Sequence, residues 1–362
     1  MYFKMPVLVY EDKNCIEKHA EELSKFGTNA LIVTGKHSAK ANGSLEDVIS
    51  ALSVYNIKYH IFDEIEENPS IETVMKARNK FKSEKIDFVI GIGGGSPLDA
   101  AKAIALMLAN PDKDEAFFDE SVKNVNALPV VAIPTTCGTG SEVTGVAVLT
   151  RHSKRTKSSM THKIFPKLAL IDIKYLKAAP DTIIKNTSID ALAHLIESFL
   201  NSNATDYSKM FVREGLRTWS LIKDALLTET FENKPSDEIY KNLSTSSTFA
   251  GMAIAHTGTS IPHALSYNIT YELKIPHGKA CAYFLAGFLN EAPAEEKEEI
   301  LKLTGFENTN DFKTYLTKVC SLSALPEEIV NNTVLQLSNN SAKLKTSSYE
   351  ITLDTLKNIA AF

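Results

Sequence analysis

The first half of the chain alternates short, strongly apolar segments with amphipathic segments of helical length. The apolar segments are rich in β-branched residues and comprise NALIVT (29–34), KYHIFDEI (58–65), DFVIGIGGG (87–95), PVVAIPTT (129–136) and LALID (168–172). Helical patterns separate them, at 44–56, 70–84 and 96–110. Parallel strands that are joined by helices become buried on both faces, which gives this kind of alternation. The pattern therefore predicts an α/β fold with a parallel sheet and helices on each face.

The pattern changes after about residue 180. Strand signals stop, and helical patterns follow at 188–200, 206–227, 238–268 and 278–291, with shorter pieces towards the end. We expect a boundary near Pro180–Asp181. Residues 1–180 would form the α/β domain and residues 181–362 an all-helical domain.

The composition is that of an ordinary globular protein, with 44% hydrophobic residues, 23% charged residues and a net charge of −5. This balance argues against a nucleic-acid or anionic-membrane partner. The four cysteines are far apart and form no C-x-x-C pair, as is typical of a reduced protein. The N-terminal residues lack the features of a signal peptide, and no apolar run approaches the ~20 residues that span a bilayer. We expect a soluble cytoplasmic protein.

A glycine-rich turn, GIGGGSPLDAAK (91–102), follows the strand that ends at Val89 and Ile90. We expect Ser96 to cap the next helix, with Pro97 at its first position and Asp99 completing a capping box. Consecutive glycines would let the backbone approach a phosphate closely at the positive end of the helix. A ligand-free turn is the alternative, but three glycines in a row exceed what a turn needs. The match to the Rossmann spacing is weak.

A second loop, PTTCGTGSEVT (134–144), follows another predicted strand and is dense in Thr, Gly and Ser. Hydroxyls and backbone amides at this density suit a polar ligand at the carboxyl edge of an open α/β sheet. The loop alone is equally compatible with a hydroxyl-rich turn. Its place after a second strand of the same sheet favours a ligand.

The stretch SIDALAHLIESF (188–199) carries Asp190, His194 and Glu197 on one stripe of an otherwise apolar helix. An unpaired charge buried there would cost several kcal/mol, so we expect a compensating partner.

More histidines follow within the predicted helical domain. His256, His263 and Tyr267 share a helical stripe (i, i+7, i+11), and His277 lies just before another helix. Each histidine could simply be a hydrogen-bonded core residue. Several such groups together suit a divalent metal, and imidazoles plus a carboxylate without thiolate suit Fe(II) or Zn(II).

Five ordered motifs resemble those of the iron-containing (group III) alcohol dehydrogenases, from the N-terminus to about residue 290. They are GGGSPLDAAK, PTTCGTGSEVT, Asp-Ala-Leu-x-His-x-x-Glu at 190–197, Ala-Gly-Met-Ala…His-Ala-Leu at 250–265, and Pro-His-Gly at 276–278. The resemblance implies a dinucleotide-binding α/β domain over residues 1–180 and a helical metal-binding domain over residues 181–362, as in dehydroquinate synthase-like folds. It places the active site in a cleft between them.

The resemblance also implies the site residues. Its four metal ligands correspond to Asp190, His194, His263 and His277. The pyrophosphate of the cofactor would lie on Gly93, Gly94, Gly95 and Ser96, with Thr135, Thr136 and Thr139 nearby and Asp99 at a position that the family keeps acidic. Glu197 is expected to orient the ligands.

Two departures from the family pattern bear on cofactor and catalysis. Gly35 stands where NAD-using members tend to carry Asp, and Lys36, His37, Ser38 and Lys40 follow it. A missing carboxylate with cations nearby suits a 2′-phosphate, so we expect NADP(H) to be preferred over NAD(H). Many members also carry a relay histidine where this chain has Tyr267. The proton relay would then be water, His256 or Tyr267.

The residues and the resemblance together predict an NAD(P)-dependent alcohol dehydrogenase, with aldehyde reduction as the expected direction. The metal would bind the oxygen of a small alcohol or aldehyde. A homo-oligomer, a dimer or larger, is implied by the resemblance alone. The alternatives are a polyol or hydroxyacid dehydrogenase of the same superfamily, a dehydroquinate synthase-type lyase, and a non-catalytic protein. The lyase would need Lys and Arg for an anionic substrate, and few lie near the predicted ligands. Retention of all four ligands argues against a non-catalytic protein.

Overall fold

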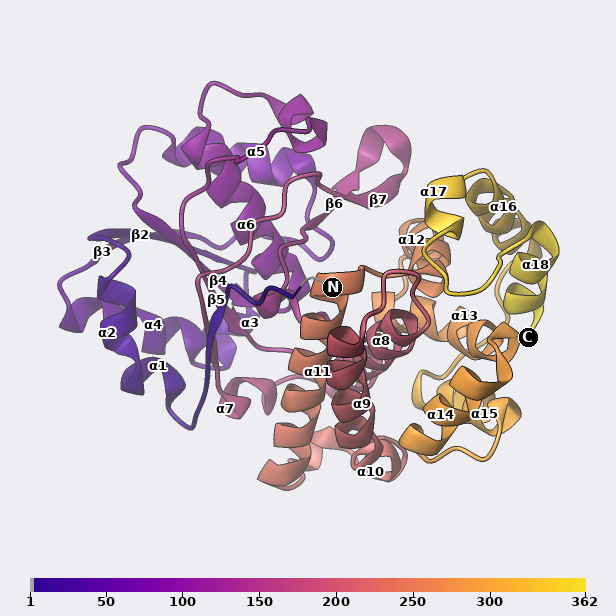
Figure 1. Cartoon of the computed structure of the whole chain (residues 1–362). Coiled ribbons are helices and arrows are strands. Elements are labelled where there is room, and N and C mark those ends of the chain that lie inside the picture. Colours follow the sequence, from indigo (N-terminus) through magenta and orange to yellow (C-terminus); the bar gives the residue numbers. More distant parts are fainter. Residues whose placement is uncertain (1–2) are drawn as a thin grey trace. The chain divides into compact units, whose positions relative to one another are not determined.

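The computed structural model describes residues 3–362 and contains a six-stranded parallel sheet (Figure 1). Its strand order is β1-β8-β5-β4-β2-β3. These strands are β1 (Leu8–Glu11), β2 (Asn29–Thr34), β3 (Lys58–Phe62), β4 (Phe88–Gly93), β5 (Val130–Pro134) and β8 (Leu168–Ile171). A separate antiparallel pair consists of β6 (Val148–Arg151) and β7 (Thr156–Ser159). The predicted parallel α/β sheet is confirmed.

Helices cover both faces of this sheet because its strands are apolar on both sides. Leu31 and Val33 of β2 pack on one face with α5 (Ile71–Phe81) and α6 (Gly95–Ala109). The alternate residues of β2 pack on the other face, with the helices α1 (Cys15–Lys18), α2 (Ala20–Ser24) and α4 (Ser44–Val54).

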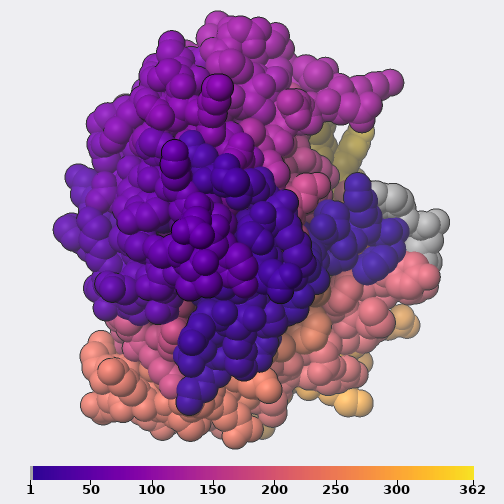
Figure 2. All heavy atoms as spheres, turned by 90° about the vertical axis from the view of Figure 1, so that its left-hand side faces the viewer, coloured from indigo at the N-terminus to yellow at the C-terminus, as the bar shows by residue number. Residues whose placement is uncertain are grey.

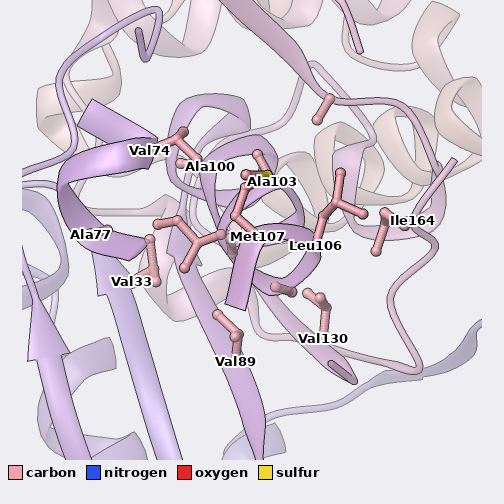
Figure 3. Close-up of a cluster of buried hydrophobic side chains, with 14 of the residues drawn as sticks. Val33, Val74, Ala77, Val89, Ala100, Ala103, Leu106, Met107, Val130 and Ile164 are labelled. Atoms are coloured by element: carbon pink, nitrogen blue, oxygen red, sulfur yellow. The ribbon is translucent and has the colours of Figure 1, made fainter. Parts of the chain in front are cut away.

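Figure 3 shows the first of these cores, in which Val74 of α5 and Leu106 of α6 lie over Val89 and Val130 of the sheet. Burial of each such aliphatic side chain contributes about 1.5–3 kcal/mol to the stability of the fold. This packing fixes the position of α6, and therefore of the glycine turn at its N-terminus. Figure 2 shows the left-hand side of the view in Figure 1, and its indigo and purple surface comes largely from the N-terminal segments of the chain.

Helices dominate the chain from Asp181 onwards. They are α8 (Asp181–Phe199), α9 (Asp206–Ser220), α10 (Lys223–Thr228), α11 (Asp237–Thr257), α12 (Ile261–Leu273), α13 (His277–Glu291), α14 (Ala294–Thr304), α15 (Thr309–Val319), α16 (Glu327–Ser338), α17 (Ser341–Leu344) and α18 (Leu353–Ala361). Within residues 3–362, no helix has the length and apolarity needed to cross a membrane.

The chain divides into two compact units. The α/β unit comprises Met5–Thr136 and Ser141–Ala179. The helical unit comprises Pro180–Phe362 together with residues 3–4 and 137–140. The loop PTTCGTGSEVT is thus divided between the two units, because its middle residues, 137–140, belong to the helical unit.

Two helical predictions are wrong. The pattern at 206–227 predicts one helix, but α9 ends at Ser220 and α10 begins at Lys223. The sequence pattern at 238–268 predicts one continuous helix, but α11 ends at Thr257 and α12 begins at Ile261. Gly258 adopts a φ of 73°, in the left-handed region that glycine enters without steric cost and that ends helices. His256 therefore lies on α11, whereas His263 and Tyr267 lie on α12, and the three do not share one helical stripe.

Candidate metal centre and cofactor loops

Helix α8 carries three polar side chains into a water-excluded interior. Asp190 is 3% exposed, His194 5% and Glu197 0%. The indole N–H of Trp219, on α9, donates to the carbonyl oxygen of Ser188 at 3.0 Å and anchors this part of α8. The carboxylates and the imidazole must therefore find partners within the protein.

Helix α13 reaches α8 through a glycine. A Cβ atom at Gly278 would lie 1.9 Å from the carbonyl oxygen of Asn186, so any other residue would push the two helices apart. His277 is the first residue of α13, and Cys281 follows one turn later on the same face. The close approach brings this face against Asp190.

Four potential ligand atoms converge at this point. Oδ1 of Asp190 lies 3.4 Å from Nε2 of His263, 3.9 Å from Nε2 of His277 and 3.9 Å from Sγ of Cys281. One ligand atom from each of these four residues lies within 4.8 Å of all the others. We call them the donor cluster. It contains three of the four predicted ligands, and the structure adds Cys281.

The fourth predicted ligand, His194, lies beside the donor cluster but is not part of it. Its ring stacks on that of His263, with centroids 4.4 Å apart. Its Nδ1 lies 3.2 Å from the carbonyl oxygen of Gly138. A carbonyl can only accept, so we infer that Nδ1 holds the proton and Nε2 the lone pair. Burial lowers the pKa of His194, although Asp190 opposes the shift, and this favours the neutral ring. Its role as a ligand stays a prediction.

Glu197 fixes the ring of His263. Its Oε1 lies 2.5 Å from Nδ1 of His263 and accepts from the backbone N–H of the same residue at 3.2 Å. Its Oε2 accepts from the backbone N–H of Ser260 at 2.5 Å. The carboxylate therefore holds the proton on Nδ1, and we infer that Nε2 carries a lone pair directed at Asp190.

His277 is oriented in a similar way. Ser266 donates its hydroxyl proton to the carbonyl oxygen of His263 at 2.8 Å. Its oxygen is thereby directed to accept from Nδ1 of His277, 3.4 Å away. Nε2 is then the nitrogen that faces Asp190. In their neutral forms, the two histidines thus present unprotonated nitrogens to one carboxylate.

This arrangement fits a bound cation. Nε2 of His263 has no hydrogen-bond partner within residues 3–362, although a carboxylate oxygen lies 3.4 Å away. Two acceptors that face each other in a buried site repel unless a positive charge lies between them. Burial on its own raises the pKa of Asp190, but the positive charge that His194, His263 and His277 carry when protonated holds that pKa below its usual value. A divalent metal would satisfy the carboxylate and both lone pairs.

The structure brings one of the two predicted catalytic residues to the donor cluster. The ring of Tyr267 stacks on that of His277, with centroids 5.7 Å apart. Burial raises the pKa of the Tyr267 phenol, so this group stays protonated at neutral pH. His256 instead stacks on Phe3 at 5.0 Å, and its Nδ1 lies 2.8 Å from the carbonyl oxygen of Met252.

The predicted cofactor residues follow three adjacent strands of the sheet. Since β5, β4 and β2 are neighbours and parallel, the loops at their carboxyl ends lie along one edge. Gly35, Lys36 and Ser38 follow β2; Gly93, Gly94, Gly95 and Ser96 end or follow β4; Thr135 and Thr136 follow β5. Thr139 belongs with the helical unit.

The glycine turn is required by its own geometry. Gly93 has a φ of 145°, and a Cβ atom there would lie 2.6 Å from Cγ of Pro97. Helix α6 begins at Gly95 with Gly94 as its N-cap, so the prediction of Ser96 as the cap is wrong. The Ser96 hydroxyl instead accepts from the backbone N–H of Asn68 at 3.0 Å.

Asp99 ties α6 to β6 and to the segment that precedes it. It accepts from the Ser141 hydroxyl at 2.6 Å and from the backbone N–H of Val148 at 2.9 Å. The fully buried ammonium of Lys102 lies 3.5 Å from the same carboxylate. Burial lowers the pKa of Lys102, and the carboxylates of Asp99 and Glu142 oppose that shift. Asp99 is therefore occupied by contacts within the α/β unit, and its predicted role at the cofactor stays a prediction.

Two polar residues near the glycine turn escaped the sequence reasoning. Nζ of Lys157, on β7, donates to Oδ1 of Asn68 at 2.6 Å, and the Asn68 backbone contacts Ser96. Lys157 is buried despite its charge. Nothing in the spacing around Lys157 indicates this position, because it depends on the β6–β7 pair folding back onto the loop before α5.

Comparison with known proteins defines the family. Residues 6–173 match the model described as iron-containing alcohol dehydrogenase, and residues 184–340 match that of the C-terminal part of the Fe-containing alcohol dehydrogenase family. The chain therefore belongs to the iron-containing alcohol dehydrogenase family, and the resemblance seen in the sequence is confirmed.

Individual relatives agree with this assignment. The crystal structure of an iron-containing alcohol dehydrogenase from Thermotoga maritima is 34% identical and superposes with a TM-score of 0.90, covering 99% of this chain and 98% of that one. An NADPH-dependent butanol dehydrogenase of Clostridium saccharobutylicum is 29% identical over 79% of this chain and 72% of its own length. An NAD-dependent methanol dehydrogenase of Bacillus methanolicus is 27% identical over 86% of this chain and 82% of its own length. The chain also matches the bifunctional aldehyde-alcohol dehydrogenase of Escherichia coli, but it spans only 35% of the length of that protein.

The position of Glu197 predicts the effect of replacing it. In Glu197→Gln, the amide nitrogen must face either the backbone N–H of Ser260 or the two N–H groups of His263. In both orientations the NH₂ group, itself a hydrogen-bond donor, lies against another donor. We expect the affinity for a divalent metal to fall about 10–100-fold. The measurement is competition with a chelator of known affinity. Glu299→Gln, at a half-exposed ion pair with Arg213, should leave the affinity unchanged. Equal affinities of wild type and Glu197→Gln would contradict the orienting role.

Proposed function

We propose that the chain is a metal-dependent NADP(H)-linked reductase of small aldehydes that also oxidises the corresponding alcohols. The donor cluster supports this function most directly, because it presents a buried carboxylate and oriented histidine nitrogens that call for a divalent cation. In this proposal residues 1–180 bind the dinucleotide and residues 181–362 the metal. The placement of the four cysteines, which are buried and form no disulfide within residues 3–362, supports a cytoplasmic location, and the family resemblance supports a homo-oligomer.

The metal would be held by Asp190, His263 and His277, with His194 as the further donor that the resemblance implies. Fe(II) or Zn(II) would suit these ligands. When bound, such a metal supplies Lewis acidity that polarises a carbonyl group. Glu197 holds His263 in one orientation, and Ser266 does the same for His277. The residues of the helical unit would thus fix the position of the metal's positive charge before substrate binds.

The cofactor would lie along the sheet edge formed by the loops after β2, β4 and β5. When bound, NADPH supplies the hydride. The N–H groups at the start of α6 would receive its pyrophosphate next to Gly93, Gly94, Gly95 and Ser96. Thr135, Thr136, Thr139 and Asp99 complete the proposed cofactor set. Lys157 and Asn68 would add charge and a hydrogen-bond partner close to Ser96.

Cofactor preference would be set at the end of β2. Gly35 offers no carboxylate to a ribose hydroxyl, and Lys36 and Ser38 are exposed beside it. Lys40 lies close in sequence but pairs with Asp63 at 2.7 Å. Lys36 is therefore the better candidate for a 2′-phosphate.

Tyr267 would deliver the proton to the developing alkoxide. It lies against His277 at the donor cluster, and its phenol stays protonated at neutral pH. His256, engaged with Phe3 and Met252, is the weaker of the two candidates for this role.

An activity assay tests the proposed function. The protein loaded with Fe(II) or Zn(II) should oxidise NADPH in the presence of small aldehydes, and removal of the metal by a chelator should abolish the reaction. The panel should include a polyol, a hydroxyacid and their carbonyl forms, since preference for one of these would redefine the substrate class. A protein that binds neither metal, or that turns over no substrate after loading, would refute the proposal.

The cofactor preference has its own test. In Gly35→Asp, a Cβ atom meets only an ordinary contact, 3.4 Å from the carbonyl oxygen of Ile65, so the side chain fits. Its charge would repel a 2′-phosphate and bind a ribose hydroxyl. We expect the ratio of kcat/KM for NADPH over NADH to fall by about tenfold or more, which corresponds to about 1.4 kcal/mol. Ser53→Asp adds the same charge on α4 and should leave the ratio unchanged, and an unchanged ratio in Gly35→Asp would exclude Gly35 as the determinant.

A further inference from the structure

The sulfur atom of Cys281 lies among the proposed metal ligands. Its Sγ is 3.9 Å from Oδ1 of Asp190, the oxygen that also faces His263 and His277. The four ligand atoms lie within 4.8 Å of one another, so one ion at their centre would be within reach of each after small side-chain movements. Cys281 is fully buried, and solvent does not compete for this thiol.

The local structure directs Cys281 to this position. It follows His277 by four residues on α13, which places both side chains on one face of the helix. Gly278 lets that face approach Asp190 on α8 more closely than any residue with a Cβ atom would allow. Any displacement of α13 would therefore move the imidazole and the thiol together.

An independent observation indicates that a ligand belongs in this space. Nε2 of His263, whose side chain is 2% exposed, points into the cluster without a hydrogen-bond partner in the described chain. Glu197 holds the proton of this ring on the opposite nitrogen. In the neutral ring, the lone pair of Nε2 is therefore directed at the region that Asp190, His277 and Cys281 surround.

We propose that Cys281 is a sulfur ligand of the metal, in addition to the nitrogen and oxygen donors, and this inference rests on the proposed function. Coordination releases the thiol proton to solvent and leaves a thiolate on the metal. Two histidines and one carboxylate form a set typical of Fe(II), whereas a thiolate favours Zn(II). Cys281 therefore shifts the metal preference of this chain towards zinc.

Cobalt spectroscopy of the full chain tests this ligand directly. The protein is stripped of metal with a chelator and titrated with Co(II) in the absence of oxygen. We expect an intense near-ultraviolet band from sulfur-to-cobalt charge transfer in the wild type. The band should be absent in Cys281→Ser and Cys281→Ala, and present in Cys320→Ser, whose buried thiol is not part of the donor cluster. Zn(II) affinity should fall about 10–100-fold in Cys281→Ala and stay unchanged in Cys320→Ser.

The outcomes separate this inference from the proposed function. A wild-type protein that binds Co(II) without the charge-transfer band overturns the role of Cys281 and leaves the metal site intact, whether or not the variants fold. A wild-type protein that binds neither Co(II) nor Zn(II) overturns the proposed function as well. A band that persists in Cys281→Ala also overturns the assignment.

Discussion

Asp190 places a negative charge on a helix from which water is excluded, and the organisation of the helical unit follows from that charge. Removing an ion from water costs several kcal/mol unless strong partners replace the hydration shell. The structure supplies His263, His277 and Cys281 around a single carboxylate oxygen. In their neutral forms, the two histidines present lone pairs to the carboxylate and do not neutralise it themselves. A bound cation satisfies all of them together.

The remaining features of the helical unit keep these donors in place. Gly278 sets the distance between α13 and α8, and Gly258 ends α11 so that α12 can start in a new direction with His263 in its first turn. Glu197 then joins α8 to the start of α12 through three hydrogen bonds. Each element would be unremarkable alone. Together they hold two histidine rings so that Nε2 of each ring faces the carboxylate. The entropy of ordering these rings is therefore lost during folding and not when a ligand binds.

Much of this could be predicted from the sequence, because it depends on local patterns. The β-branched segments identified five of the six strands of the parallel sheet, and the i, i+4, i+7 spacing placed Asp190, His194 and Glu197 on one helical stripe. The edge strand β1 (Leu8–Glu11) was missed, although its sequence, LVYE, carries an apolar signal like that of the other strands.

Non-local features were beyond the sequence. The helical period continues through Gly258, so the sequence predicts one stripe for His256 and His263. The left-handed backbone of Gly258 instead ends α11 and places the two histidines on different helices. The spacing of four residues between His277 and Cys281 was a usable signal, but a lone cysteine suggests a metal only when an aspartate from another helix lies beside it. The contact of Lys157 with Asn68 joins residues 89 positions apart, and no local pattern encodes it.

The central claim is that a metal compensates the buried charge of Asp190, and the stability of the helical unit measures this directly. Trp219 is the only tryptophan in the sequence and is buried against α8, so its fluorescence reports urea unfolding of this unit. With Zn(II) at about 100 times its Kd, the free energy of unfolding of the wild type should rise by about 2.7 kcal/mol. Metal-free Asp190→Asn should be at least as stable as the metal-free wild type and should gain little from Zn(II). A wild-type transition that does not move with metal, or an equal gain in Asp190→Asn, would contradict the account.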